Sequence, residues 1–200
     1  MLRTQIAVAV ASIGCLCLGA NVAAEDAFRF AEARFEKGEL RYINGLPVLT
    51  VEGTPQEIGR QQGALTAEVA VHIMAHPGNL LRKADREEFL PKLLETGRVL
   101  LPRLPQDHLA ELKAFAGQSG MDFETLAAVN VMVDAYRGSF GCSSLIVCPQ
   151  RNDTGGILFG RNLDFFTGGK IQQYSLVTVF RPAGKHAFVS VGFPGMLGCL

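Results

Sequence analysis

Gly-Cys-Ser-Ser-Leu-Ile-Val-Cys-Pro at 141–149, followed by Ile-Leu-Phe-Gly-Arg-Asn-Leu-Asp-Phe at 157–165, is the stretch of sequence that decides the fold. Both segments are β-prone and mostly apolar, and turn-forming residues separate them, which predicts a β-hairpin. With a turn centred at position 153, antiparallel pairing places Cys142 roughly opposite Asp164 and brings Arg161 to the same end. The sequence therefore predicts that a thiol, a guanidinium and a carboxylate converge.

The Gly141–Cys142 bond is the candidate processing site. A thiolate in a tight turn can attack the preceding carbonyl and convert the amide into a thioester that water cleaves, and glycine tolerates the strained backbone this needs. The new α-amine of Cys142 has a reference pKa of about 8, so it can serve as general base for the thiol near neutral pH.

The candidate catalytic residues are thus Cys142, Arg161 and Asp164. Arg161 would stabilise negative charge on the sulfur, and Asp164 would orient the amine and the guanidinium. Asn162 lies between these two residues and can face away from them. The alternative is a buried strand cysteine beside a local ion pair of Arg161 and Asp164.

Residues 1–24 have the pattern of a secretory signal peptide. Arg3 supplies the positive start, an apolar stretch covers 6–20, and Val22-Ala23-Ala24 suits cleavage before Glu25. The apolar run is shorter than the ~20 residues that a membrane span needs. We therefore expect a secreted or periplasmic protein without a stable membrane span, with a lipoprotein anchored through Cys15 as the weaker alternative.

Charge and cysteine content narrow the function classes. The chain has 19 basic and 19 acidic residues, which argues against nucleic acid as a main partner. After signal removal three cysteines remain, an odd number that leaves at least one thiol without an intramolecular partner. Cys148 and Cys199 are expected to be buried strand residues.

His72 and His76 are four residues apart on a predicted helix, a spacing that can bind a metal ion. No glutamate follows the first histidine, so the zinc-protease pattern is absent, and we expect no metal and no cofactor.

The rest of the chain indicates an α+β protein, mainly helical over 25–141 and built of strands over 142–200. Thr54-Pro55-Gln56-Glu57 is typical of a capped helix start, and Gly59 and Gly63 on one face of that helix indicate close packing against another backbone. Further helices are expected over 27–37, 86–101, 106–119 and 122–136, and strands over 46–52, 143–149, 157–165, 174–181 and 186–193.

Two separate motifs make this chain resemble a known family. Gly-Cys-Ser-Ser at 141–144, with Gly-Arg-Asn-Leu-Asp-Phe at 160–165, is similar to the penicillin acyltransferase family (peptidase family C45) of N-terminal nucleophile (Ntn) hydrolases. The segment 52–63, which contains Gly-Thr-Pro-Gln-Glu-Ile-Gly, is similar to that family's N-terminal signature. The resemblance covers about residues 46–196, and extends more distantly to choloylglycine hydrolases and acid ceramidase.

The resemblance implies an αββα four-layer sandwich, autocatalytic cleavage before the nucleophile, and hydrolysis or transfer of the acyl group of a small-molecule N-acyl amide. Cys142 matches the nucleophile, Gly141 the upstream side of the processing bond, and Arg161 and Asp164 the family's Arg-Asn-x-Asp pair. A lipid-acting hydrolase of the ceramidase or phospholipase B-like type is an alternative.

Members of the family continue for well over a hundred residues beyond the position that matches Leu200. Those residues supply an oxyanion-stabilising asparagine, a further arginine and the rest of both sheets. We therefore expect a sandwich that is incomplete at the C-terminus, in a fragment of a longer protein. A truncated, non-catalytic relative is the alternative.

Overall fold

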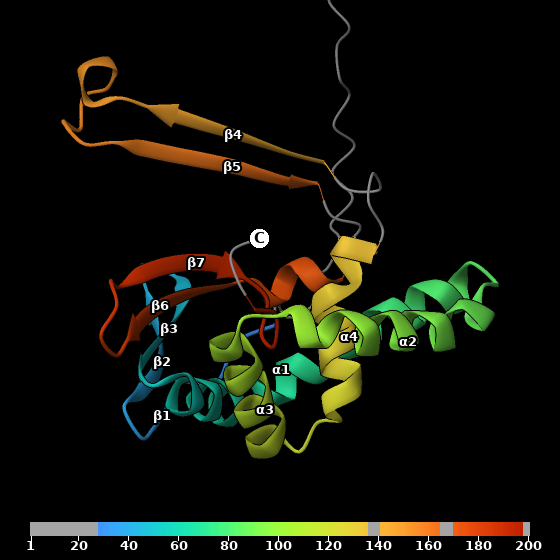
Figure 1. Ribbon diagram of the computed structural model, residues 1–200. Helices are drawn as coiled ribbons and strands as arrows, with labels where there is room; N and C mark the ends of the chain where they lie inside the picture. Colours follow the sequence, from blue (N-terminus) through green and yellow to red (C-terminus); the bar gives the residue numbers. More distant parts are fainter. Residues whose placement is uncertain (1–27, 136–140, 165–169, 198–200) are drawn as a thin grey trace, which may run out of the picture.

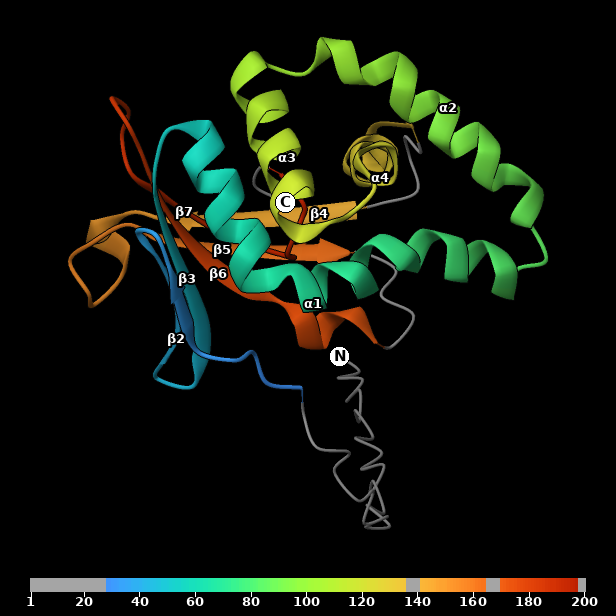
Figure 2. The same cartoon turned by 90° about the horizontal axis from the view of Figure 1, so that it is seen from below.

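The computed structural model describes residues 28–135, 141–164 and 170–197, without the side chains of 132–135, 163 and 164. The predicted signal peptide at 1–24 and Cys199 lie outside the described residues. Within them the chain has an α+β fold. Helices cover one face of a five-stranded sheet, and a two-stranded hairpin stands apart from it (Figures 1 and 2).

The five-stranded sheet joins both halves of the chain. Its strand order is β1-β2-β3-β6-β7, with bounds Ala33–Phe35, Gly38–Ile43, Leu46–Gly53, Leu176–Pro182 and Phe188–Gly192. β3 and β6 are parallel, and the other neighbours are antiparallel. The strands predicted over 46–52, 174–181 and 186–193 are confirmed to within two residues.

The prediction of a helix over 27–37 is wrong, because this segment contains β1 and the turn into β2. Glu36 has a positive φ of 51°, a turn conformation that an α-helix excludes, and Ala33 pairs with Leu40. Phe30 is buried among side chains of the sheet. The apolar spacing of this segment is helical, but burial of Phe30 and pairing with β2 decide its structure.

Helix α1 (Pro55–Lys83) begins at the predicted capping box. The Thr54 hydroxyl accepts a hydrogen bond from the Glu57 amide at 3.3 Å, and the Glu57 carboxylate accepts one from the Thr54 amide at 2.7 Å. The hydrogen bonds that this carboxylate accepts from the Thr54 amide and the Thr54 hydroxyl hold the pKa of Glu57 below its ordinary value. The helix continues to Lys83, with Pro77 inside it.

The predicted close packing at Gly59 and Gly63 is confirmed against helix α3 (Gln106–Ser119). A Cβ at Gly59 would lie 2.2 Å from the carbonyl oxygen of Glu111, and one at Gly63 would lie 2.8 Å from that of Phe115. Both separations are far below van der Waals contact, so only glycine fits at the interface between α1 and α3.

The other helices are α2 (Leu90–Leu100) and α4 (Phe123–Ala135), which fall within the predicted ranges. The carboxylate of Asp122 accepts a hydrogen bond from the Thr125 amide at 2.8 Å and caps α4. The described residues also form short 3-10 helices: η1 (Glu87–Phe89), η2 (Leu101–Arg103), η3 (Pro149–Arg151) and η4 (Ile171–Tyr174).

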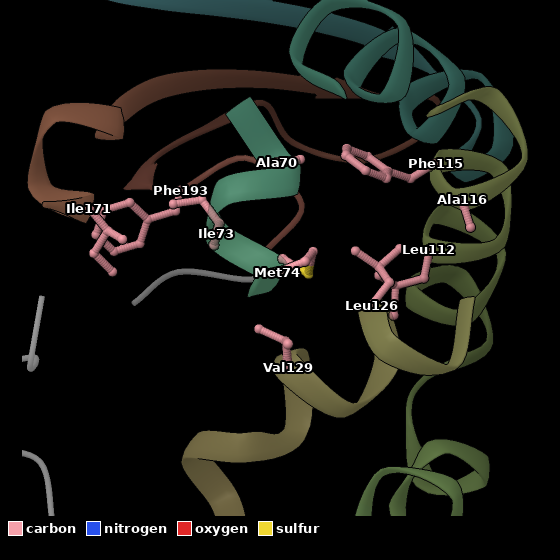
Figure 3. Close-up of a cluster of buried hydrophobic side chains, with 10 residues drawn as sticks. All are labelled: Ala70, Ile73, Met74, Leu112, Phe115, Ala116, Leu126, Val129, Ile171 and Phe193. Atoms are coloured by element: carbon pink, nitrogen blue, oxygen red, sulfur yellow. The ribbon is translucent and has the colours of Figure 1, made fainter. Parts of the chain in front are cut away.

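Helix α1 contributes to two hydrophobic cores. One lies between α1, α3, α4 and the C-terminal segment, and contains Ala70, Ile73, Met74, Leu112, Phe115, Ala116, Leu126, Val129, Ile171 and Phe193 (Figure 3). The other lies between α1 and the sheet, and contains Phe30, Leu40, Leu49, Val51, Ile58, Val69 and Leu176. Because one helix serves both cores, its position determines how the sheet and the helical layer fit together.

A polar pair lies in the interface between α1 and α3. The Gln62 side-chain amide donates a hydrogen bond to the Glu111 carboxylate at 2.5 Å. Burial raises the pKa of Glu111 to about 7; the Gln62 hydrogen bond opposes this rise, and the charge of Asp107 adds to it. Asp107 itself has a lowered pKa because Lys185, from the turn between β6 and β7, pairs with it.

We predict that Gly59→Ala destabilises the protein by about 1–3 kcal/mol, because the added methyl group overlaps the backbone of α3. Gly117→Ala is the matched control. Gly117 is also helical, but a Cβ there meets nothing within 4 Å, so this change should stabilise the protein by up to about 1 kcal/mol. Urea unfolding measures both. Equal effects of the two changes would contradict the close packing.

We predict that Glu111 makes the protein less stable as pH rises from 4.5 to about 7. Its pKa is raised in the folded state, so folding favours the protonated form and loses that advantage as the carboxyl ionises. The loss is at most about 3 kcal/mol, and Glu111→Gln should remove it. The variant should therefore unfold at a higher temperature than wild type at pH 8, with little difference at pH 4.5. Glu68→Gln is the control, because it removes a carboxylate from an exposed position of α1 outside the interface with α3.

Candidate functional site

The predicted hairpin is present as β4 (Gly141–Val147) and β5 (Leu158–Asp164). Asn152 organises the turn that joins them. Its side-chain amide donates hydrogen bonds to the carbonyls of Cys148 at 2.9 Å and Gly156 at 2.8 Å, and its side-chain oxygen accepts one from the Thr154 amide at 2.9 Å. This arrangement bridges the two sides of the turn and fixes where pairing begins.

The register differs by one residue from the prediction. Cys142 pairs with Leu163, and Asp164 pairs with Gly141, so the centre of the turn lies between Asn152 and Asp153. The position of a turn centre within a run of turn-forming residues depends on side-chain hydrogen bonds such as those of Asn152. The sequence pattern could place this centre only approximately.

Cys142 and Arg161 meet as predicted. Nη2 of Arg161 donates a hydrogen bond to Sγ of Cys142 at 3.2 Å, and both residues are exposed. Arg161 lies directly opposite Ser144, so its side chain reaches diagonally along one face of the hairpin to the sulfur. The structure therefore brings together a thiol and a permanently charged guanidinium, the donor type that stabilises a negatively charged sulfur.

Asp164 is placed only by its backbone, opposite Gly141 at the proposed processing bond. Its side chain lies outside the described residues, but its register position, two residues from Asn162 on β5, is on the face opposite that of Cys142 and Arg161. The strand pairing therefore does not give the predicted convergence of the carboxylate with the thiol and the guanidinium. Asn162 pairs with Ser143, and neighbouring residues of a strand alternate between faces. Asn162 thus lies on the face opposite that of Cys142 and Arg161.

The hairpin contacts little of the rest of the described structure. None of its residues between 141 and 162 is buried, and Figure 1 shows it standing clear of the main sheet. Leu145, Ile146 and Phe159 are 65–67% exposed although they are large and apolar. Cys148 was predicted to be buried in a strand, and this prediction is wrong: it is exposed and follows the last residue of β4. Cys148 lies beside the turn rather than in the paired region.

Two hollows occur elsewhere on the described part of the molecule. One is an open groove between α1 and α3, bordered by Arg60 and Lys113 among others. The other lies between α1 and the sheet, and Gln62, Thr66 and Thr178 are among its polar lining residues. Neither hollow is bordered by Cys142 or Arg161.

The buried polar residues of α1 were not anticipated from the sequence. Gln62 and Thr66 are four residues apart, and this spacing places two polar side chains on one buried face of the helix. It is the sequence signal that points to the hollow.

His72 stacks on Tyr174, with ring centroids 5.3 Å apart and an angle of 8° between the ring planes. Within residues 28–135, 141–164 and 170–197, no group of three or more histidine, cysteine, aspartate or glutamate side chains is arranged to hold a metal ion. Among the helices described in these ranges, none is both long and apolar enough to cross a membrane.

Comparison with known proteins finds a distant relative but no matching family. No protein-family model matches the chain. An uncharacterized protein of Archaeoglobus fulgidus is 25% identical over 194 residues, an alignment that covers 82% of this chain and 32% of the relative. The chain thus spans about a third of the length of that relative.

Proposed function

We propose that this chain carries the nucleophile segment of a secreted, autoprocessing cysteine amidohydrolase or acyltransferase of the N-terminal nucleophile type, acting on a small-molecule N-acyl amide. The observation that carries the proposal is the 3.2 Å hydrogen bond from Arg161 to the sulfur of Cys142, the residue that directly follows Gly141. The resemblance of both motifs to the penicillin acyltransferase family supports the same reaction class.

The first step in this proposal is self-cleavage. Sγ of Cys142 attacks the carbonyl carbon of Gly141, the C–S bond forms as the C–N bond breaks, and the α-amine of Cys142 is released. Water then attacks the thioester, leaving a carboxylate on Gly141 and the thiol on Cys142. Arg161 stabilises the sulfur while it is negatively charged.

Turnover then uses the two groups of the same residue. The free α-amine of Cys142 accepts the thiol proton, the sulfur attacks the acyl carbon of the substrate, and the substrate C–N bond breaks as the departing amine takes up that proton. The thioester is resolved by water in a hydrolase, or by an acceptor amine in an acyltransferase. Either route restores the thiol.

We also propose that the described part belongs to an αββα sandwich of the Ntn type. The face of the main sheet that points away from α1 has apolar residues on three neighbouring strands: Val48, Val177, Val179, Val189 and Val191. Val189 and Val191 are 58% and 60% exposed. A sheet with helices on one face and valines on the other suits a second sheet layer, and the apolar β4–β5 hairpin is the proposed start of that layer.

A lipid-acting hydrolase of the ceramidase or phospholipase B-like type is the second candidate. The observation that favours it is that Ile146 and Phe159 pair on the same face of the hairpin as Cys142 and Arg161. An apolar acyl chain bound at the thiol would meet these two side chains. Activity that rises with the acyl-chain length of a series of N-acyl amides would favour this candidate over a hydrolase of short acyl groups.

We predict that the protein expressed from its complete gene splits into two chains, and that N-terminal sequencing of the downstream chain begins at Cys142. Cys142→Ala should abolish both the cleavage and the hydrolysis of N-acyl amides. Cys148→Ala is the matched control, because Cys148 is a second exposed free thiol of the same hairpin, and this variant should still be cleaved. A Cys142→Ala protein that is cleaved and keeps its amidase activity would falsify the proposal. A single stable band from the wild-type gene would favour a non-catalytic relative.

We predict that Val191→Lys destabilises the protein from the complete gene by at least about 2 kcal/mol, because a second sheet layer would bury the introduced charge. Val71→Lys is the matched control. Val71 has a similar exposure, 53% against 60%, but lies on helix α1, so its substitution should be nearly neutral. Chemical unfolding measures both variants. Equal, small effects would show that the outer face of the sheet is exposed to solvent.

A further inference from the structure

Ser143 and Ser144 are adjacent residues of β4 that lie on opposite faces of the hairpin. Ser144 pairs directly with Arg161, whereas Ser143 pairs with Asn162. Cys142, Ser144 and Arg161 therefore share one face. Across that face, Arg161 and Cys142 are diagonal neighbours, about 7–8 Å apart at their Cα atoms, while Ser144 is the direct neighbour at about 5 Å.

The Arg161 side chain must cross this face to reach the sulfur. Its stem starts opposite Ser144, and its Nη2 atom ends 3.2 Å from Sγ of Cys142. Because Ser144 is the direct cross-strand neighbour of Arg161, the residue at position 144 borders the start of this path. A serine has one oxygen beyond Cβ, so it leaves the space there open. A β-branched apolar side chain would fill it and contact the arginine stem.

We propose that Ser144 is a positioning residue for the Cys142–Arg161 pair. Its small side chain, directly opposite Arg161, leaves the diagonal path free along which the guanidinium reaches the sulfur. Its catalytic significance rests on the function proposed above, but the geometric claim does not, since it concerns only where the guanidinium lies relative to Cys142.

Ser143 is the matched control position for Ser144, because the two differ in the face of the hairpin on which they lie. Both are exposed serines in the middle of β4, so they have the same strand propensity. Their distances from the turn differ by one residue. A change at Ser143 meets Asn162 on the other face. Any effect of a substitution on strand stability should therefore appear at both positions, and an effect on Arg161 only at position 144.

The test compares alkylation of Cys142 by anionic iodoacetate and by neutral iodoacetamide, with each cysteine quantified separately by peptide mass spectrometry. Both reagents attack the same sulfur, so the ratio of their rates reports the local positive charge rather than general reactivity. Arg161→Gln should lower the iodoacetate preference at Cys142 about threefold, as expected for the loss of one exposed charge contact. The wild-type preference should shrink at high salt.

The proposal requires that Ser144→Val lower the iodoacetate-to-iodoacetamide rate ratio at Cys142, as Arg161→Gln does. Ser144→Ala should show the wild-type ratio, because alanine leaves the path open. Ser143→Val should keep the ratio as well. Cys148 is the internal reference, and its ratio should be the same in every variant. A wild-type ratio in Ser144→Val, or an equal drop in Ser143→Val, would overturn the proposal.

Self-cleavage is scored on the same samples by the appearance of a peptide that starts at Cys142. In an active protein, Ser144→Val should cleave itself more slowly than wild type. Ser144→Ala should cleave itself at a rate close to that of wild type. If the alkylation ratios follow the prediction while no variant is cleaved, the positioning role stands and the proposed function fails. If cleavage depends on Cys142 but the ratios do not depend on position 144, the function stands and the positioning role fails.

Discussion

The contact between helices α1 and α3 is the constraint on which the rest of the described structure depends. Gly59 and Gly63 let the two backbones approach until a single added Cβ would overlap a carbonyl oxygen. This approach fixes α1 in place, and α1 packs against the sheet on one side and against α3 and α4 on the other. It also encloses Glu111, whose carboxyl has the Gln62 amide as its one hydrogen-bond partner within the described part of the chain.

Hydrogen bonds of one side chain and apolar packing hold the C-terminal segment to this helical layer. Asn130 of α4 donates a hydrogen bond to the Gly195 carbonyl at 2.8 Å and accepts one from the Leu197 amide at 2.6 Å. Phe193 fills the adjoining core (Figure 3). The sheet, α1, α4 and the segment after β7 therefore form one packed body. The β4–β5 hairpin differs from it, because its apolar side chains have no packing partners among the described residues that would bury them.

Much of the secondary structure could be predicted where the signal is local. Thr54 and Glu57 form their capping box within one turn of helix, and Asp122 caps α4 through Thr125. The strands after position 140 follow apolar runs between turn-forming residues. The segment 27–37 could not be predicted in this way, because Phe30 and the partner strand β2, rather than its own periodicity, decide its structure. Cys148 was misplaced because an apolar run does not show where strand pairing stops.

The sequence by itself determined that Cys142 follows a glycine at the start of a hairpin and that Arg161 lies near it on the return strand. These features depend on residue order and on antiparallel pairing, which are local. Only the tertiary structure decided the register, because the Asn152 hydrogen bonds select one turn centre among neighbouring positions. That choice places Arg161 on the face of Cys142 and Ser144, since a shift of one residue moves a side chain to the opposite face of a strand.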